Sequence, residues 1–167
     1  MDWKELHKNS TVVDLHTHAA LKATIFPRRS LGVGKSQFIT RFFKETFWPF
    51  SERITFPKME KGGVDVMLST AYTLEQGWID DISLIKWLLW LAPWVRKRIV
   101  DPTYFDATNA MLDVMEKQIG DYNKAREADT RHAVLVTDRE ELKEGIAAGD
   151  MCVIHSIEGA HCIQGHE

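Results

Sequence analysis

Short apolar runs rich in β-branched residues recur along this chain and are typical of buried strands. The run VDVMLSTA follows a turn at Gly62 and Gly63 and is mostly apolar, as expected for a strand covered on both faces of a parallel sheet. The run HAVLV predicts a shorter strand, and MCVIHSIEGAH predicts a strand that closes at Glu158. The run TVVDLHTH near the N-terminus also has the β-branched content of a strand. The predicted strands are therefore residues 11–18, 64–71, 132–136 and 151–158.

Segments of helical periodicity separate these runs. A short polar helix or arm precedes the first strand, and a looser segment begins at Ala19. Residues 106–127 repeat apolar side chains at helical spacing, which predicts a long amphipathic helix. A shorter helix begins at a capping box formed by Thr137 and Glu140 and stops at Gly149. Strands that alternate with helical segments predict parallel β/α units, and hence an α/β barrel or a layered sheet.

We expect one domain over residues 1–167, with insertions at about 22–56 and 79–103. The first insertion holds seven of the eight phenylalanines and several basic residues, and three prolines interrupt it or follow it directly. No period is sustained there, which predicts a long and only partly helical segment.

The second insertion contains the strongly apolar sequence DDISLIKWLLWLAPWVRKRI. Trp87, Trp90 and Trp94 are spaced for one helical face, and Pro93 is expected to disturb the last turn. The uncharged stretch is far shorter than the roughly 20 residues that cross a bilayer, so no membrane span is predicted. We expect the helix to be buried in its own domain or to cap the site. A homodimer contact is the first alternative, and surface contact with a membrane is the second, because the following RKR would suit anionic headgroups.

Composition narrows the classes of partner. With 21 Lys plus Arg against 24 Asp plus Glu, the net charge of -3 gives no general reason to bind nucleic acid. Cys152 and Cys162 form no C-x-x-C pair, which fits a reducing compartment. The N-terminal residues resemble neither a signal peptide nor a transit peptide, so we expect a cytoplasmic protein.

The candidate chemistry begins with two histidines at the end of the first strand. Side chains alternate along a strand, so Asp14, His16 and His18 are expected on one face. Two imidazoles at this spacing can reach one cation, and His with carboxylate oxygen is a common ligand set for zinc. The alternative is that the histidines are surface residues or hydrogen-bonded core residues.

Glu158 closes the last apolar run in the same manner, and Gly159 permits a sharp exit from the strand. A carboxylate at the end of a buried strand is costly unless it is paired or bound to a cation. The alternative is a hydrogen bond to backbone amides or to an arginine. His161 is a candidate to orient a ligand, or a simple loop residue, whereas His155 has the opposite parity and is expected to face the helices.

These motifs resemble the membrane dipeptidase (renal dipeptidase) family of zinc metallopeptidases, in the amidohydrolase superfamily. The resemblance lies in VVDLHTH, FPKMEKGGVDVMLSTAY and TDREELKEGIAAGDMCVIHSIEGAH. It implies the N-terminal portion of a (β/α)8 TIM barrel of metal-dependent hydrolase type, with one or two zinc ions in the complete site. His16 and Glu158 match family ligands, whereas His18 stands where the family has Asp. Asp14 matches the leading Asp of the family motif, and we expect it to order the strand end by hydrogen bonding.

The function that the resemblance implies is hydrolysis of a dipeptide or a related amide by a metal-activated water. The expected metal ligands are His16, His18 and Glu158, and the proton-transfer Asp is expected beyond residue 167, because we expect this chain to be the N-terminal part of a longer protein. DLHTH also resembles the opening motif of PHP-type phosphoesterases, which is the first alternative. A noncatalytic binding chain is the second, if the gene ends at residue 167.

Overall fold

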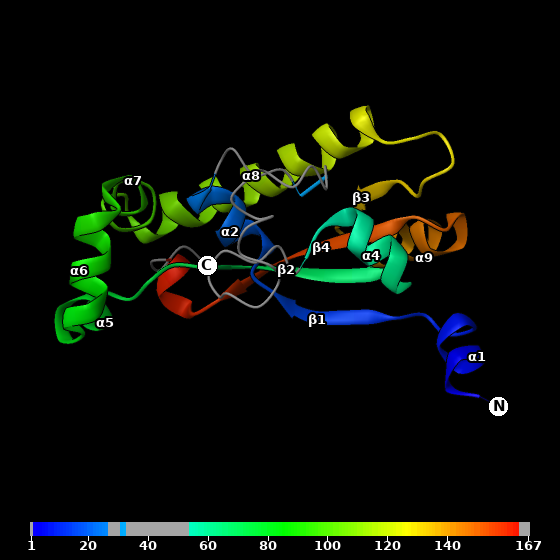
Figure 1. Ribbon diagram of the computed structural model, residues 1–167, viewed down its shortest axis with the longest axis horizontal. Coiled ribbons are helices and arrows are strands. Elements are labelled where there is room, and N and C mark those ends of the chain that lie inside the picture. The colour runs from blue at the N-terminus through cyan, green and yellow to red at the C-terminus, as the bar shows by residue number, and fades with distance from the viewer. Residues whose placement is uncertain (1, 27–30, 33–53, 164–167) are drawn as a thin grey trace.

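A computed structural model describes residues 2–26, 31–32 and 54–163 of the chain. The described part is an α/β fold built on a parallel sheet of four strands in the order β1-β2-β4-β3 (Figure 1). This confirms the predicted α/β class and all four predicted strands. Their bounds are Val13–Thr17 for β1, Val66–Tyr72 for β2, Ala133–Leu135 for β3 and Met151–Glu158 for β4.

Helices connect the strands, and their bounds follow in chain order. They are α1 Trp3–Lys8, α2 Ala19–Ile25, α4 Phe56–Gly62, α5 Gln76–Asp81, α6 Ser83–Leu91, α7 Pro93–Val95, the π-helical turn η1 Arg96–Val100, α8 Tyr104–Ala125, α9 Arg139–Ala148 and the 3-10 turn η2 Ala160–Ile163. None of the helices in the described part of the chain is long and apolar enough to cross a membrane.

The two faces of the sheet are covered by different helices. The larger core includes Met67 and Val153 of the sheet with Met111 and Met115 of α8. On the opposite face, Cys152 packs in a smaller cluster with apolar residues of α9. The order of the strands explains why different helices cover the two faces. The connections β1-α2-β2 and β2-α8-β3 move across the sheet in one direction, whereas β3-α9-β4 returns in the opposite direction. Because parallel crossovers are right-handed, the return helix must lie on the other face.

The arrangement of strands bears on the barrel prediction. In a (β/α)8 barrel, consecutive strands are neighbours and the helices form an outer ring. Strands β1, β2 and β4 follow that order, but the short β3 lies at the edge beyond β4 and its helix α9 covers the opposite face. The α/β class is therefore established, whereas membership of a barrel remains a prediction.

Helix boundaries correct two local predictions. The segment after the first strand is not loose but forms α2, whose residues Ala19 and Ala20 are buried in the larger core. The cap of α9 is Asp138, which accepts hydrogen bonds from the backbone of Glu140 and Glu141, and not Thr137. The predicted stop at Gly149 is confirmed, because this residue adopts the left-handed conformation with φ of 79° that glycine favours.

The predicted burial of the tryptophan-rich helix is wrong. Trp87, Trp90 and Trp94 are 55%, 75% and 49% exposed, and α6 has no buried residue. Pro93 does interrupt the segment, because α6 ends at Leu91 and α7 begins at the proline. Most of the first predicted insertion, residues 22–56, lies outside the described residues, and the domain boundaries remain predictions.

Candidate metal centre

His16 reaches the site because β1 carries a bulge. Asp14 pairs with Met67 and Thr17 pairs with Ser69, so three steps along β1 match two along β2. Asp14 therefore faces the larger core with Met67, and it does not share a face with His16 as simple alternation predicts. The Asp14 carboxylate instead accepts a hydrogen bond of 3.2 Å from the backbone N–H of His16, which helps to fix the bulge.

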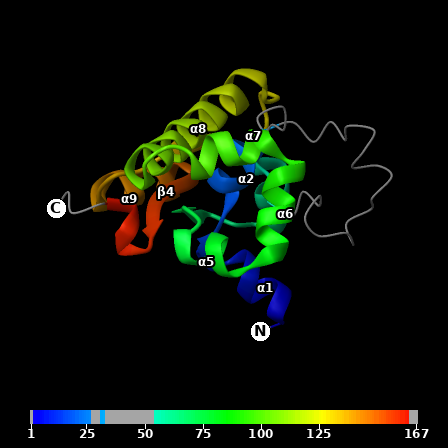
Figure 2. The ribbon, with the colours of Figure 1, turned by 90° about the vertical axis from the view of Figure 1, so that its left-hand side faces the viewer.

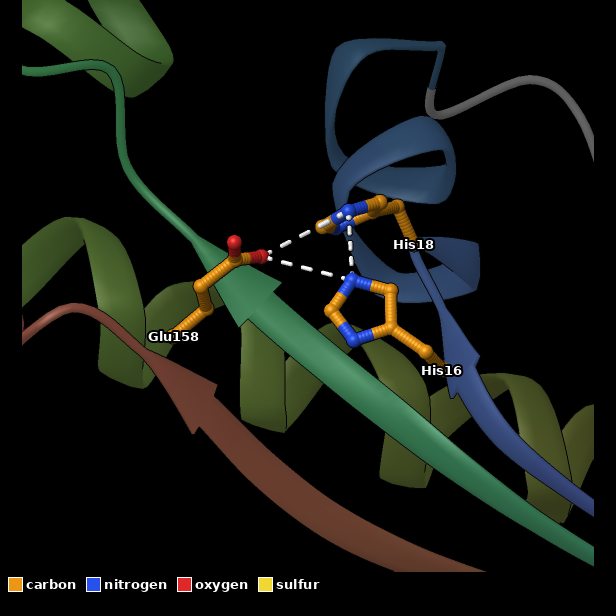
Figure 3. A group of neighbouring side chains, drawn as sticks. All are labelled: His16, His18 and Glu158. Carbon is orange, nitrogen blue, oxygen red and sulfur yellow. Dashed lines mark hydrogen bonds and ion pairs between the residues drawn. The ribbon is translucent and has the colours of Figure 1, made fainter.

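His18 and Glu158 enter the site from the ends of two elements. His18 lies just past β1 as the N-cap residue of α2, and Glu158 is the last residue of β4. Strand β2 separates β1 from β4, so the side chains must span two inter-strand spacings of about 4.8 Å each. Figure 3 shows His16, His18 and Glu158 pointing toward one another at this end of the sheet.

The distances within this group, here called the His–His–Glu cluster, suit one small cation. The Nε2 atoms of His16 and His18 are 3.1 Å apart, and Glu158 Oε2 lies 3.4 Å from the first and 3.6 Å from the second. Ligand atoms about 2.0–2.1 Å from a tetrahedral zinc ion are separated by about 3.3 Å. The three ligand atoms of the cluster therefore have nearly the spacing of three corners of a zinc site.

The cluster is open to solvent. The side chains of His16, His18 and Glu158 are 56%, 40% and 46% exposed. Structural zinc sites close the shell with four protein ligands, whereas catalytic sites keep one position for water or substrate. Three ligands with an exposed side therefore resemble the catalytic type of site.

The same contacts also permit a description without metal. A protonated His16 or His18 would form an ion pair with Glu158, and one ring would donate a hydrogen bond to the other. Exposed pairs of this kind contribute little to stability, typically about 0–1 kcal/mol. A cation bound between the three ligand atoms would be an alternative partner for all of them, because each can donate a lone pair to it.

His161 lies near the cluster and has partners of its own. Its Nε2 atom lies 3.0 Å from the carbonyl oxygen of Thr73 and 3.6 Å from Cys162 Sγ. Since a carbonyl can only accept, Nε2 carries the proton and cannot serve as a base toward Cys162. Nδ1 lies 3.8 Å from Glu75. His161 thus helps to hold the loop after β2, and its predicted role in orienting a ligand remains a prediction.

His155 has the orientation that its parity predicts. Its Nε2 atom lies 3.4 Å from Glu116 Oε1 of helix α8, on the side away from the His–His–Glu cluster. This confirms that His155 faces the helices.

Tyr72 is a further neighbour of the cluster, and no sequence motif marks it. It pairs in register with Glu158, and its ring centroid lies 6.1 Å from those of both His18 and His161. Burial raises the pKa of its phenol, and the negative charges of Glu75 and Glu158 raise it further. The phenol therefore stays protonated at neutral pH, as a hydrogen-bond donor beside the cluster. Its signal in the sequence is its place at the end of a buried strand run.

Comparison with known proteins assigns no family, because no protein-family model matches the sequence and no curated protein matches it.

Proposed function

We propose that the chain provides part of the active site of a metal-dependent hydrolase that cleaves a dipeptide or a related amide. The observation that carries the proposal is the His–His–Glu cluster, whose three ligand atoms have the mutual spacing of a zinc site. Its place at the carboxyl ends of parallel strands supports the proposal, because α/β enzymes bind their ligands there.

The roles of the residues follow from their positions. His16 and His18 would hold one cation through Nε2, and Glu158 would bind it through Oε2 and leave its second oxygen for another ion. A divalent ion bound there would supply a Lewis acid and lower the pKa of a water molecule. The protonated phenol of Tyr72 can donate a hydrogen bond to a substrate carbonyl or carboxylate beside Glu158.

The larger architecture is part of the same proposal. Strands β1, β2 and β4 would be the first three strands of a (β/α)8 barrel, with β3 and α9 as an elaboration between the second and third. The order of β1, β2 and β4 in the sheet supports this arrangement. Their carboxyl ends would then form one sector of the barrel's catalytic face.

A PHP-type phosphoesterase is the second candidate. Two imidazoles from one strand end favour it, because His18 supplies a neutral nitrogen where the dipeptidase family has a carboxylate. The two candidates differ in substrate, so one assay separates them.

The experiment compares dipeptide and phosphate-ester hydrolysis by a zinc-loaded protein that contains residues 1–167 together with the rest of the proposed barrel, because residues 1–167 would supply only part of the active site and are expected to be inactive alone. We expect dipeptide hydrolysis to fall at least 100-fold in the double variant His16→Ala/His18→Ala. His132→Ala is the matched control, because His132 is exposed and contacts Arg126 instead of the cluster. Hydrolysis of p-nitrophenyl phosphate alone would favour the phosphoesterase, and equal turnover in all three proteins would refute a role for the cluster.

A further inference from the structure

We propose that helices α5, α6 and α7 dock the protein on the surface of a bilayer rich in anionic lipid, without spanning it. The docking surface consists of exposed apolar side chains on these helices and on the residue that joins α5 to α6. They are Trp78, Ile82, Leu84, Trp87, Leu88, Trp90, Leu91 and Trp94.

The exposed side chains of α6 form a stripe. Leu84, Trp87, Leu88 and Leu91 follow the spacing of one helical face and are 61%, 55%, 49% and 47% exposed. A nine-residue helix with no fully buried residue, and only Ile85 and Leu89 among its apolar residues half-buried, gains little stability from packing and is marginal in water. An apolar environment over the stripe would therefore stabilise α6.

The charged residues near α6 indicate which apolar environment would cover the stripe. Residues 83–100 contain Lys86, Arg96, Lys97 and Arg98 and no acidic residue, although the whole chain has a net charge of -3. Of these four cations, Arg96 pairs with the Asp101 carboxylate, whereas Lys86 and Arg98 donate to backbone carbonyls. Asp80 and Asp81 lie at the α5 end of the docking surface, so the positive charge is local to its other end, where Arg96, Lys97 and Arg98 follow Trp94 and can attract anionic headgroups.

The residue types suit the interface between a bilayer and water. Tryptophan is enriched where a bilayer meets water, because its ring is apolar and its N–H is polar. Four of the chain's six tryptophans lie on α5, α6 and α7. A short helix that ends before Pro93 suits a position in the plane of the interface.

The position of the docking surface relates it to the candidate metal centre. Helices α5 and α6 lie at the end of the sheet toward which the strands run, and Figure 2 views the molecule from that side. Three residues join Tyr72 at the end of β2 to the start of α5. Docking would therefore bring the catalytic end of the sheet close to the membrane surface.

The test is cosedimentation of the protein with lipid vesicles. We expect at least tenfold tighter binding to phosphatidylcholine vesicles that contain phosphatidylglycerol than to pure phosphatidylcholine, and weaker binding at high salt. Trp87→Ser/Leu88→Ser should reduce binding about tenfold or more. Trp3→Ser/Leu6→Ser is the matched control, because this pair is also exposed, at 70% and 56%, but lies on α1.

A charge variant tests the second half of the proposal. Lys97→Glu should weaken binding to the anionic vesicles about tenfold, whereas Lys4→Glu on α1 should leave it unchanged. Equal binding to both kinds of vesicle would overturn the proposal. The proposal would also be overturned if the protein bound no vesicles and formed a dimer that Trp87→Ser/Leu88→Ser dissociates in analytical ultracentrifugation. The docking surface would then be a subunit contact. Metal content plays no part in these measurements, so they are independent of the proposed hydrolase.

Discussion

Arg131 and Asp65 form an ion pair of 2.8 Å between the edge of the sheet and its centre, with both side chains less than a quarter exposed. The guanidinium also donates to the carbonyl oxygens of Val64, Gly149 and Asp150, which directly precede β2 or β4. The second carboxylate oxygen of Asp65 accepts from the backbone N–H of Val12, just before β1. One pair thus ties together the amino ends of the three strands whose carboxyl ends carry the candidate site.

Arg131→Met should lower the free energy of unfolding by about 3 kcal/mol, because it leaves Asp65 and several carbonyls without their donor. Lys143→Met is the control, because Lys143 forms an exposed pair with Glu140 on one helix, worth at most about 0.5 kcal/mol. Urea denaturation monitored by circular dichroism measures both. Equal losses in the two variants would mean that the Arg131 contacts contribute no more than a surface pair.

Asn123 of α8 pairs with the backbone of β3 much as a neighbouring strand would. Its side-chain amide donates to the carbonyl oxygen of Ala133 at 2.7 Å and accepts from the N–H of the same residue at 3.0 Å. Asn123→Ala should therefore destabilise the protein by about 2 kcal/mol. Asn109→Ala, at an exposed site of the same helix, should cost less than 0.5 kcal/mol, about the limit for surface substitutions. Chemical denaturation that ranks the two variants in the opposite order would contradict the assigned pairing.

Gly145 is required by close packing between α9 and the sheet. A Cβ atom at this position would lie 2.6 Å from Cys152 Sγ. Gly145→Ala should therefore destabilise the fold by about 1–3 kcal/mol, and Cys152→Ala should recover part of the loss. Gly120→Ala on α8 is the matched control, because nothing lies within 4 Å of a Cβ atom there. That variant should be neutral or more stable by up to about 1 kcal/mol. Thermal unfolding is measured for the wild type, Gly145→Ala, Gly145→Ala/Cys152→Ala and Gly120→Ala. A Gly145→Ala protein as stable as Gly120→Ala would refute this packing.

The strands and the convergence of the ligands were predictable because both depend on local pattern. Apolar runs identify buried strands, and the carboxyl ends of parallel strands meet at one edge of the sheet, which brings Glu158 to His16 and His18. The face of Asp14 was not predictable, because a bulge shifts the register and leaves no mark in the composition of β1. The position of β3 beyond β4 depends on long-range pairing that no local pattern encodes.

The exposure of Trp87 was missed for a related reason. Helical spacing shows which face of α6 is apolar, but it does not show what covers that face. Tyr72 was missed because a single tyrosine at a strand end has no distinctive spacing, and only register with Glu158 marks it.

Tyr72 should make stability depend on alkaline pH. Its folded-state pKa is raised above the ordinary value of 10.0, mainly by burial and also by Glu75 and Glu158. Below about pH 10 the phenol is protonated in both the folded and the unfolded protein, so it does not make the free energy of unfolding depend on pH. As the pH rises from there through the raised pKa of the folded state, the free energy of unfolding falls. Tyr72→Phe should lose less stability over this range than the wild type. Parallel loss in both proteins, measured by urea denaturation between pH 8 and 11, would contradict the inferred environment of the phenol.

Zinc binding by the His–His–Glu cluster is tested most directly by metal content after dialysis. Four proteins are compared: the wild type, His16→Ala/His18→Ala, Glu158→Gln and the control His132→Ala. Each is loaded with zinc and dialysed against metal-free buffer, and its zinc content is then measured by mass spectrometry. Circular dichroism checks that each protein is folded. We predict at least one zinc ion per chain in the wild type and in the control, less in Glu158→Gln, and none in the folded double variant. Equal zinc in the double variant and the wild type would contradict the assignment of His16 and His18 as ligands.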